Sequence, residues 1–198
     1  MRAWSIQMWL LVVTLLCAMP LQAGKFMQPD NLYPRVKLET SQGDIVIELD
    51  RSRAPITVNN FLSYVKTNAY NNTVFHRLIA DFVVQGGGYD MQFSEIEQRK
   101  TIFNESGNGL KNQIGSIAMA RLSDPHSASS QFYINLGDND SLDPGSRWGY
   151  AVFGRVVSGF EVLDKINALE TETSEKLGWP NVPSEPLLLK TVRLLPIE

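Results

Sequence analysis

Short runs with strand propensity recur along the chain, whereas helical periodicity occurs in only two widely separated places. Residues 35–39 and 45–49 alternate polar and apolar side chains on either side of a turn at 41–44, which predicts a β-hairpin. One amphipathic helix is expected to start at Pro55, and a second is expected over residues 160–169. Many short strands with two distant helices favour an antiparallel barrel or sandwich over repeated βαβ units.

The remaining strands follow from the same pattern. Residues 170–187 form a polar, proline-bearing segment, and the strand after it is expected to close a sheet. The further strand-like segments are residues 73–78, 82–85, 116–120, 131–136, 151–157 and 190–195.

Size and charge limit the classes of protein to which the chain can belong. Its 198 residues suit a single domain, and 43% hydrophobic with 20% charged residues is a globular composition. A net charge of −3 and a pI near 5.5 argue against nucleic acid as a partner, because phosphate binding requires a basic surface.

The first 23 residues have the layout of a secretory signal peptide. Arg2 is their only charged residue, residues 8–19 are apolar apart from Thr14, and Ala23 is a small residue at the expected cut. An uncleaved anchor is the alternative, although the apolar run is short for a membrane span of about 20 residues. Cleavage removes Cys17, the only cysteine, so the mature protein has no disulfide.

We therefore expect three parts along the chain. These are a signal peptide at 1–23, a flexible leader at 24–34 and one folded domain at 35–198. No membrane attachment is expected after cleavage.

The segment FHRLIADFVVQGGG, residues 75–88, is the most informative about function. It places Arg77 among apolar residues of strand propensity, where a charge requires a partner or a cleft. Gln85 precedes three consecutive glycines, which indicate a sharp turn or the close approach of another group to the backbone. The segment predicts the wall of an apolar groove that contains one guanidinium and one amide.

Three other chemistries find no support in the sequence. Asp124-Pro125-His126 lies among serines, but no G-x-S-x-G motif is present, and the proline indicates a surface loop rather than a hydrolase site. Two histidines far apart in the chain are a poor ligand set, so no metal is expected. The glycine run lacks the spacing and the lysine of a phosphate loop.

Four motifs in order resemble the cyclophilin family of peptidyl-prolyl cis-trans isomerases. They are FHRLIADFVVQGGG, GSIAMAR, SSQFYIN and LDPGSRWGYAVFGRV. The resemblance covers residues 35–196 and is closest to bacterial exported members. It implies a mainly β fold, a closed eight-stranded antiparallel β-barrel capped by two α-helices, and it implies no cofactor.

The resemblance also implies a role for individual residues. Arg77 is the expected catalytic residue. Gln85 would bond the substrate backbone, and Gln131 would hold Arg77 and Gln85 in place. Phe82, Val83, Tyr133 and Leu142 would line the proline pocket, and Ala120 and Arg121 would run along the bound peptide. The expected substrate-binding residues are therefore Phe82, Val83, Gln85, Ala120, Arg121, Gln131, Tyr133, Leu142 and Tyr150.

The chain departs from the family pattern in the pocket itself. Val83 stands where methionine is usual, and Tyr133 replaces phenylalanine and adds a hydroxyl that needs a partner or water. Ser141 stands where cyclosporin-sensitive members carry tryptophan, so we expect weak cyclosporin binding. The loop between Met119 and Gln131 is one residue longer than in the common eukaryotic form.

Two functions follow as hypotheses of different classes. The first is a peptidyl-prolyl cis-trans isomerase, acting as a monomer in the periplasm of a Gram-negative bacterium on proline-containing segments of exported proteins as they fold. The alternative is a chaperone on the same scaffold, which would hold proline peptides with little turnover because the pocket is altered.

Overall fold

Twelve strands and two α-helices make up the computed structural model, which describes residues 27–175 and 177–197. The helices are α1 (Pro55–Lys66) and α2 (Phe160–Asn167), with two short 3-10 turns at Ser106–Asn108 and Asp140–Leu142. The strands are β1 (Arg35–Thr40), β2 (Asp44–Leu49), β3 (Thr73–Val74), β4 (Arg77–Ile79), β5 (Val83–Gly86), β6 (Tyr89–Asp90), β7 (Ser116–Met119), β8 (Phe132–Asn135), β9 (Val152–Ser158), β10 (Thr171–Glu172), β11 (Val182–Pro183) and β12 (Leu188–Leu194).

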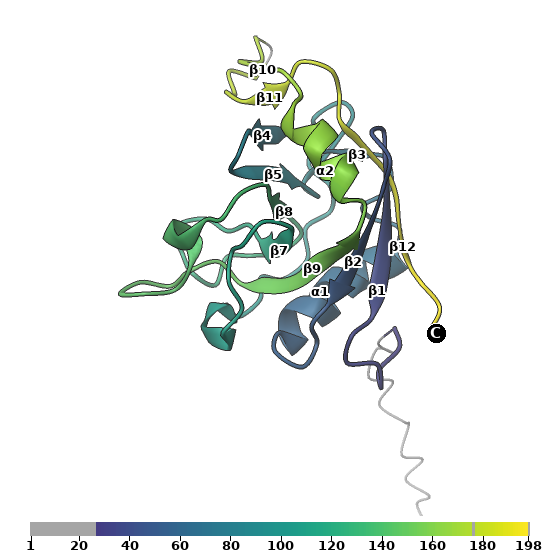
Figure 1. Ribbon diagram of the computed structural model, residues 1–198, viewed down its shortest axis with the longest axis vertical. Helices are drawn as coiled ribbons and strands as arrows, with labels where there is room; N and C mark the ends of the chain where they lie inside the picture. Colours follow the sequence, from purple (N-terminus) through teal and green to yellow (C-terminus); the bar gives the residue numbers. More distant parts are fainter. Residues whose placement is uncertain (1–26, 176, 198) are drawn as a thin grey trace, which may run out of the picture.

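Ten of the strands form one curled antiparallel sheet, in the order β4-β5-β8-β7-β9-β2-β1-β12-β3-β6 (Figure 1). The predicted hairpin is present, because β1 and β2 pair from Arg35↔Glu48 to Glu39↔Asp44. A small separate ladder joins β10 to β11. The mainly β class, the antiparallel pairing and the two helices are therefore confirmed.

The sheet is a half-barrel, in contrast to the closed eight-stranded barrel that the resemblance implies. Within the described residues, its end strands β4 and β6 do not pair with each other. One long hairpin, residues 73–90, runs from one end of the sheet to the other. In it β3 pairs with β6 at one end, and β4 pairs with β5 at the other end. The hairpin is interrupted at residues 75–76 and 87–88, where its register shifts by one residue, so the strand expected at 73–78 is divided into β3 and β4. β6 lies beyond the strand expected at 82–85.

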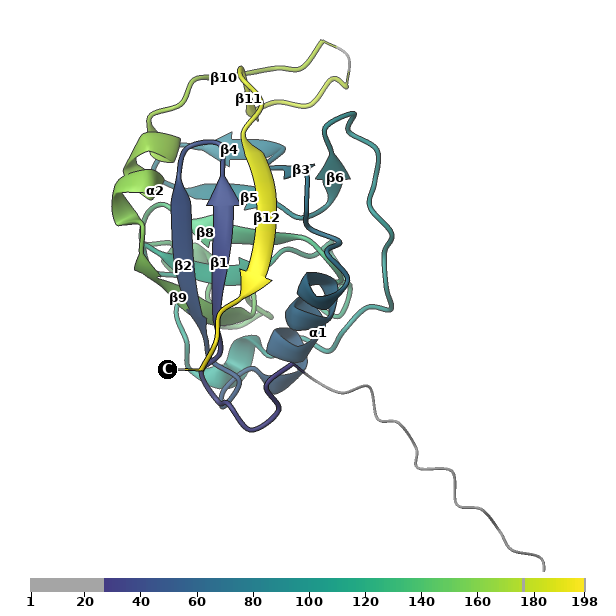
Figure 2. The same cartoon turned by 90° about the vertical axis from the view of Figure 1, so that its right-hand side faces the viewer.

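The helices lie on opposite sides of the β1–β2–β12 strands (Figure 2). Helix α1 begins at Pro55 as predicted and buries Val58, Phe61, Leu62 and Val65. Helix α2 ends at Asn167, two residues before the predicted end, and buries its own apolar stripe. Both stripes join the strands in one hydrophobic core.

Phe61 of α1 lies at the aromatic centre of this core. Its ring centroid is 5.1 Å from that of Tyr70, 5.4 Å from that of Phe132 and 5.3 Å from that of Phe153. Such edge and tilted ring pairs add to the free energy of burial. The helix is thereby fixed against β8 and β9.

A carboxylate from a distant loop caps the start of α1. Ala54 offers no side-chain cap, but Glu105 accepts hydrogen bonds from the backbone N–H of Ile56 at 3.1 Å and of Thr57 at 2.8 Å. A negative charge at a helix N-terminus is favourable, and it satisfies two backbone donors that have no intrahelical partner. The hydrogen bonds of Glu105 therefore connect the long segment 91–115 to the start of α1.

The expected flexible leader is held against the sheet where it is described. Arg51 is buried, and its guanidinium donates to the carbonyl oxygens of Met27, Gln28 and Asn31. Burial lowers the pKa of Arg51, but the three carbonyls and the side chain of Asn59 satisfy the charge. Residues 27–33 therefore contact the folded domain through these hydrogen bonds, and the division into a leader at 24–34 and a domain at 35–198 stays a prediction. The proposed signal peptide lies outside the described residues.

No helix of the described part of the chain has both the length and the apolar character that crossing a membrane requires. The segment before β12, expected to be polar, folds back over the hairpin. Its Trp179 ring lies 5.0 Å from that of Tyr89 and 6.2 Å from that of His76.

His76 is the buried titratable group of this aromatic cluster. Its ring packs edge-on against Tyr89 at 4.8 Å, and its Nδ1 has no hydrogen-bond partner among the described residues. Burial, together with the positive charge of Arg77 beside it, lowers the pKa of His76 to about 4. His76 is therefore neutral in the folded protein at pH 7.

We expect His76 to make the folded state less stable as the pH falls. The unfolded chain takes up a proton near pH 6.5, whereas the folded protein resists it down to about pH 4. The contribution of His76 is complete above the higher value and is lost progressively towards the lower one, by roughly 3 kcal/mol.

Urea unfolding at about pH 7.5 and about pH 4.5 measures this effect. The free energy of unfolding should fall less across this interval in His76→Phe than in the wild type. An equal fall in both proteins would show that another group is responsible.

Candidate functional site

Arg77 and Gln85 lie directly opposite each other on β4 and β5, so their side chains share one face of the sheet. The Arg77 Nη1 donates to Gln85 Oε1 at 3.4 Å, which is a long hydrogen bond. Within residues 27–175 and 177–197, no carboxylate forms an ion pair with Arg77, so it is not part of a surface salt bridge. Gln85 is the only hydrogen-bond partner of this half-buried guanidinium among the described residues, so most of its five N–H donors are available to a ligand.

Gln131 extends this contact into a relay of three side chains. Gln85 Nε2 donates to Gln131 Oε1 at 2.9 Å, and Tyr89 and Glu95 line the same cavity as Gln131. Among the described residues Gln131 hydrogen-bonds Gln85 but not Arg77, and its role in holding both in place stays a prediction.

The glycine run makes room for the relay. A Cβ on Gly88 would lie 2.7 Å from the Gln131 side chain, and one on Gly86 would lie 2.7 Å from the ring of Phe75. Gly87 adopts a φ of +76°, which is strained for residues with a side chain. The glycines therefore serve both purposes that the sequence indicates, a turn and a close approach.

The apolar residues of the predicted pocket gather beside the guanidinium in a cluster separate from the main core. Val83 and Tyr133 are buried with Ala118 and Val152 at its centre. Partly buried side chains surround them, and these are Phe82, Leu110, Ala120, Leu142 and Tyr150. The structure thus brings every predicted pocket residue to one place.

The hydroxyl of Tyr133 has a partner that the sequence does not reveal. It donates to Asn112 Oδ1 at 2.7 Å, and Asn112 donates both its backbone N–H and its side-chain amide to Asp143 at 2.9 Å. Burial raises the pKa of the Tyr133 hydroxyl, which stays protonated and able to donate. Asn112 lies far from these residues in sequence, and no local motif marks it.

Asp143 anchors this network beside the apolar cluster. Burial alone would raise the pKa of Asp143, but the hydrogen bonds from Asn112 and the nearby Lys111 outweigh it and lower the pKa. The carboxylate therefore stays ionised and fixes the loop after Leu142 to the floor of the groove.

Arg121 lies two residues after the end of β7, and its guanidinium is already hydrogen-bonded within the protein. It donates to the carbonyl oxygens of Leu122 at 2.8 Å and Trp148 at 2.8 Å, and it lies 4.5 Å from the centre of the Tyr150 ring. The N–H of Ala120 is bound to the carbonyl of Gln131 at 3.0 Å. A substrate can therefore meet Ala120 at its carbonyl or methyl group.

Two cavities flank this arrangement. Cavity A, of about 360 Å³, is lined by Gln85, Tyr89, Ala120, Arg121 and Gln131 among others. Cavity B, of about 840 Å³, is lined by Arg121, Ser141, Leu142, Trp148 and Tyr150 among others. Both cavities are lined by Arg121 and both adjoin the apolar cluster, and we call the surface that the three make up the groove.

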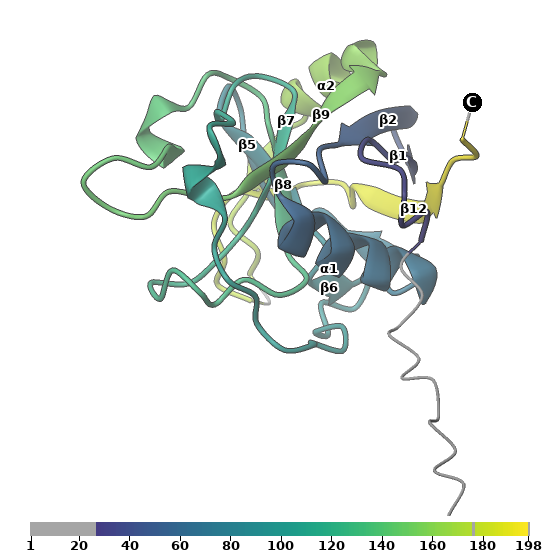
Figure 3. The same cartoon turned by 90° about the horizontal axis from the view of Figure 1, so that it is seen from below.

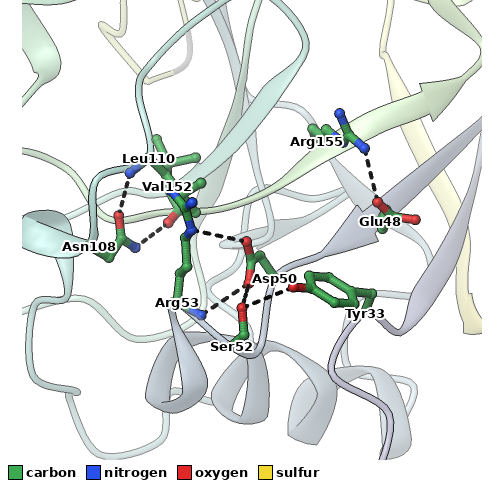
Figure 4. Close-up of polar contacts among 9 residues, drawn as sticks. All are labelled: Tyr33, Glu48, Asp50, Ser52, Arg53, Asn108, Leu110, Val152 and Arg155. Atoms are coloured by element: carbon green, nitrogen blue, oxygen red, sulfur yellow. Dashed lines mark hydrogen bonds and ion pairs between the residues drawn. The ribbon is translucent and has the colours of Figure 1, made fainter.

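A third cavity, of about 400 Å³, is lined by residues of β2, β9 and the segment 110–116 among others, and four of its charged side chains form ion pairs with one another. Figure 4 shows Arg155 directed at Glu48, at 3.2 Å, and Arg53 at Asp50, at 3.8 Å. Asp50 also accepts from Ser52 and from the backbone N–H of Arg53, which shapes the turn before α1.

His126 is not placed for nucleophilic catalysis. Its Nδ1 accepts from the backbone N–H of Asn104 at 3.2 Å, and its ring stacks on Phe103. Ser127 uses its hydroxyl within the same turn, where it donates to the Asp124 carbonyl at 2.6 Å. The loop is a surface turn, as its proline predicts.

Comparison with known proteins gives the same assignment as the geometry. The family model described as cyclophilin type peptidyl-prolyl cis-trans isomerase/CLD matches residues 35–188. The chain is 46% identical over 161 residues to peptidyl-prolyl cis-trans isomerase A of Dickeya dadantii, covering 81% of this chain and 84% of the relative. It is 44% identical over 161 residues to peptidyl-prolyl cis-trans isomerase B of Escherichia coli, covering 79% and 97%.

A solved structure agrees in fold. The cyclophilin type peptidyl-prolyl cis-trans isomerase of Cryptosporidium parvum, crystallised in the presence of the dipeptide Ala-Pro, matches with a TM-score of 0.68 and 25% identity. The match covers 82% of this chain and 99% of that one. A groove with a guanidinium, two amides and an apolar wall, on this fold and with these relatives, leads to one conclusion: the chain belongs to the cyclophilin family of peptidyl-prolyl cis-trans isomerases.

Proposed function

We propose that the chain accelerates rotation about X–Pro bonds, with Arg77 as the catalytic residue, during the folding of exported proteins. The observation that carries this proposal is the relay that holds the Arg77 guanidinium beside the apolar cluster. Export to the periplasm rests on the signal-like pattern of residues 1–23. We infer that the enzyme acts as a monomer on unfolded or partly folded chains.

The chemistry requires a donor that distinguishes a twisted amide from a planar one. Rotation about an amide costs about 18–20 kcal/mol because the nitrogen lone pair is delocalised into the carbonyl. For X–Pro bonds the uncatalysed exchange takes tens to hundreds of seconds. When the bond is half turned, the prolyl nitrogen regains its lone pair and becomes a hydrogen-bond acceptor.

Arg77 is suited to bind that twisted state. A donor fixed before the twist binds the transition state and gains little from the planar ground state. The Gln85–Gln131 relay supplies the fixing, and the apolar wall around Val83 and Tyr133 would grip the proline ring and exclude water. No covalent step and no net proton transfer are needed.

Replacing Arg77 tests the proposal. We expect Arg77→Ala to lower kcat/KM for an X–Pro peptide at least about a hundredfold, because one oriented donor contributes about 2.7–4 kcal/mol. Its Tm should stay near that of the wild type. Arg155→Ala removes an exposed arginine outside the groove and should leave kcat/KM unchanged.

Two outcomes would contradict this assignment. A loss of Tm as large as the loss of activity would make Arg77 a structural residue. No acceleration by the wild type, with peptide binding intact, would favour the alternative of a proline-peptide-binding chaperone.

Weak cyclosporin binding is a further part of the proposal, and it rests on Ser141 at the edge of cavity B. Ser141→Trp should raise the affinity at least about tenfold, because an indole adds an N–H donor and a large apolar face. Ser146→Trp, on another part of the same cavity, is the matched control and should change little. Calorimetric titration measures both, and equal affinities would show that residue 141 does not face the ligand.

A further inference from the structure

Three aromatic rings outside the proline pocket form an exposed cluster, which we call the aromatic ridge. It consists of Phe103, His126 and Trp148. Phe103 is 54% exposed and Trp148 is 46% exposed, and Leu122 on the same loop as His126 is 76% exposed. Single exposed apolar side chains are ordinary, but a group of them marks an interaction site.

Each ring of the ridge contacts the other two. Phe103 stacks on His126 with centroids 4.6 Å apart and an angle of 17°. Trp148 stands edge-on to both, 5.7 Å from Phe103 and 5.1 Å from His126. The rings come from three separate loops, so the cluster is a tertiary feature.

Buried hydrogen bonds hold these loops together. The side-chain amide of Asn104, which is buried, donates to the carbonyls of Pro125 at 3.1 Å and Gly149 at 3.0 Å. Arg121 donates to the carbonyl of Trp148 at 2.8 Å. The scaffold therefore presents apolar rings to water in one fixed arrangement, which lowers the entropy lost when a ligand binds them.

The ridge is continuous with the groove of the proposed active site. Leu122 lines cavity A with Gln85 and Gln131, and Trp148 lines cavity B with Leu142. Figure 3 shows the loops around residues 121–127 and 143–149 on the side of the sheet away from β12. A polypeptide that leaves the groove along either cavity meets this surface.

We propose that the aromatic ridge binds an aromatic or large aliphatic side chain of the same polypeptide whose X–Pro bond lies in the groove. This inference rests on the proposed function. It extends the substrate from a proline dipeptide to an unfolded segment with an apolar residue at a set distance from the proline.

A second copy of the chain fits the ridge less well than an unfolded substrate. Two half-exposed rings and Leu122 present on the order of 300 Å², whereas a stable protein interface buries about 800 Å² per partner. An unfolded chain offers single apolar side chains, each of which needs only a small surface.

A peptide series tests the proposal. Alanine-rich peptides with one Pro carry a single Phe placed one to six residues away on either side, and an all-alanine flank is the reference. NMR exchange measurements give kcat and KM for each peptide. In the wild type, Phe at a favoured spacing should lower KM about tenfold while kcat stays the same, as expected when an aromatic anchor is gained.

Variants of the ridge assign the effect. Phe103→Ser should abolish the spacing preference without changing kcat/KM for the reference peptide, and Phe103→Tyr should restore it. Trp148→Ser should also abolish the preference. Phe160→Ser is the matched control, because Phe160 is 48% exposed at the start of α2, outside the ridge, and the preference should persist. Equal Tm values show that the variants are folded.

The outcomes separate this inference from the proposed function. No turnover of the reference peptide by the wild type would contradict the isomerase function itself. Turnover without any spacing preference, or with a preference that Phe103→Ser leaves intact, would overturn the ridge proposal alone. Self-association in sedimentation that Phe103→Ser removes, with peptide kinetics unaffected, would assign the ridge to a second copy and also overturn it.

Discussion

The hydrogen bond between Gln85 and Gln131 is the contact on which the proposed site depends. It holds the Gln85 amide, which accepts a hydrogen bond from Arg77, and we propose that the guanidinium is directed in this way. The hydrogen bond also depends on the glycines after Gln85, because a side chain on Gly88 would occupy the space of the Gln131 amide. The break in the hairpin at 87–88 is therefore a requirement of the site as well as of the sheet.

A second network supports the apolar side of the groove. Tyr133 is buried in the apolar cluster, and its hydroxyl donates a hydrogen bond to Asn112, which in turn donates to Asp143. A buried hydroxyl without a partner would be costly, so Tyr133 and Asn112 form a matched pair. Because Asp143 follows Leu142, the network also positions the loop that leads to the aromatic ridge. The apolar cluster and the loop that leads to the aromatic ridge are thus connected by one network of hydrogen bonds.

Local patterns in the sequence were enough to predict the β1–β2 hairpin and the start of α1, whereas the residues expected in the pocket came from the resemblance to the cyclophilin family and stay a prediction. Alternation and apolar periodicity depend only on residues a few positions apart, and each of the four motifs is a short continuous stretch of sequence. The interruption of the 73–90 hairpin was missed because it occurs where the chain bends from one end of the sheet to the other. The contacts of Arg51 with the backbone carbonyls of the leader were missed because no side-chain pattern in the sequence indicates them. Glu105 and Asn112 act across long sequence separations and were missed for the same reason.

The claim that the amide relay acts through Arg77 is tested most directly by a double-mutant cycle on kcat/KM. Gln131→Ala alone should lower kcat/KM about tenfold, because the guanidinium loses its fixed support. In a chain that already carries Arg77→Ala, the same substitution should have almost no further effect. If Gln131→Ala causes its full loss in the absence of Arg77, the two residues act independently and the relay does not direct the guanidinium.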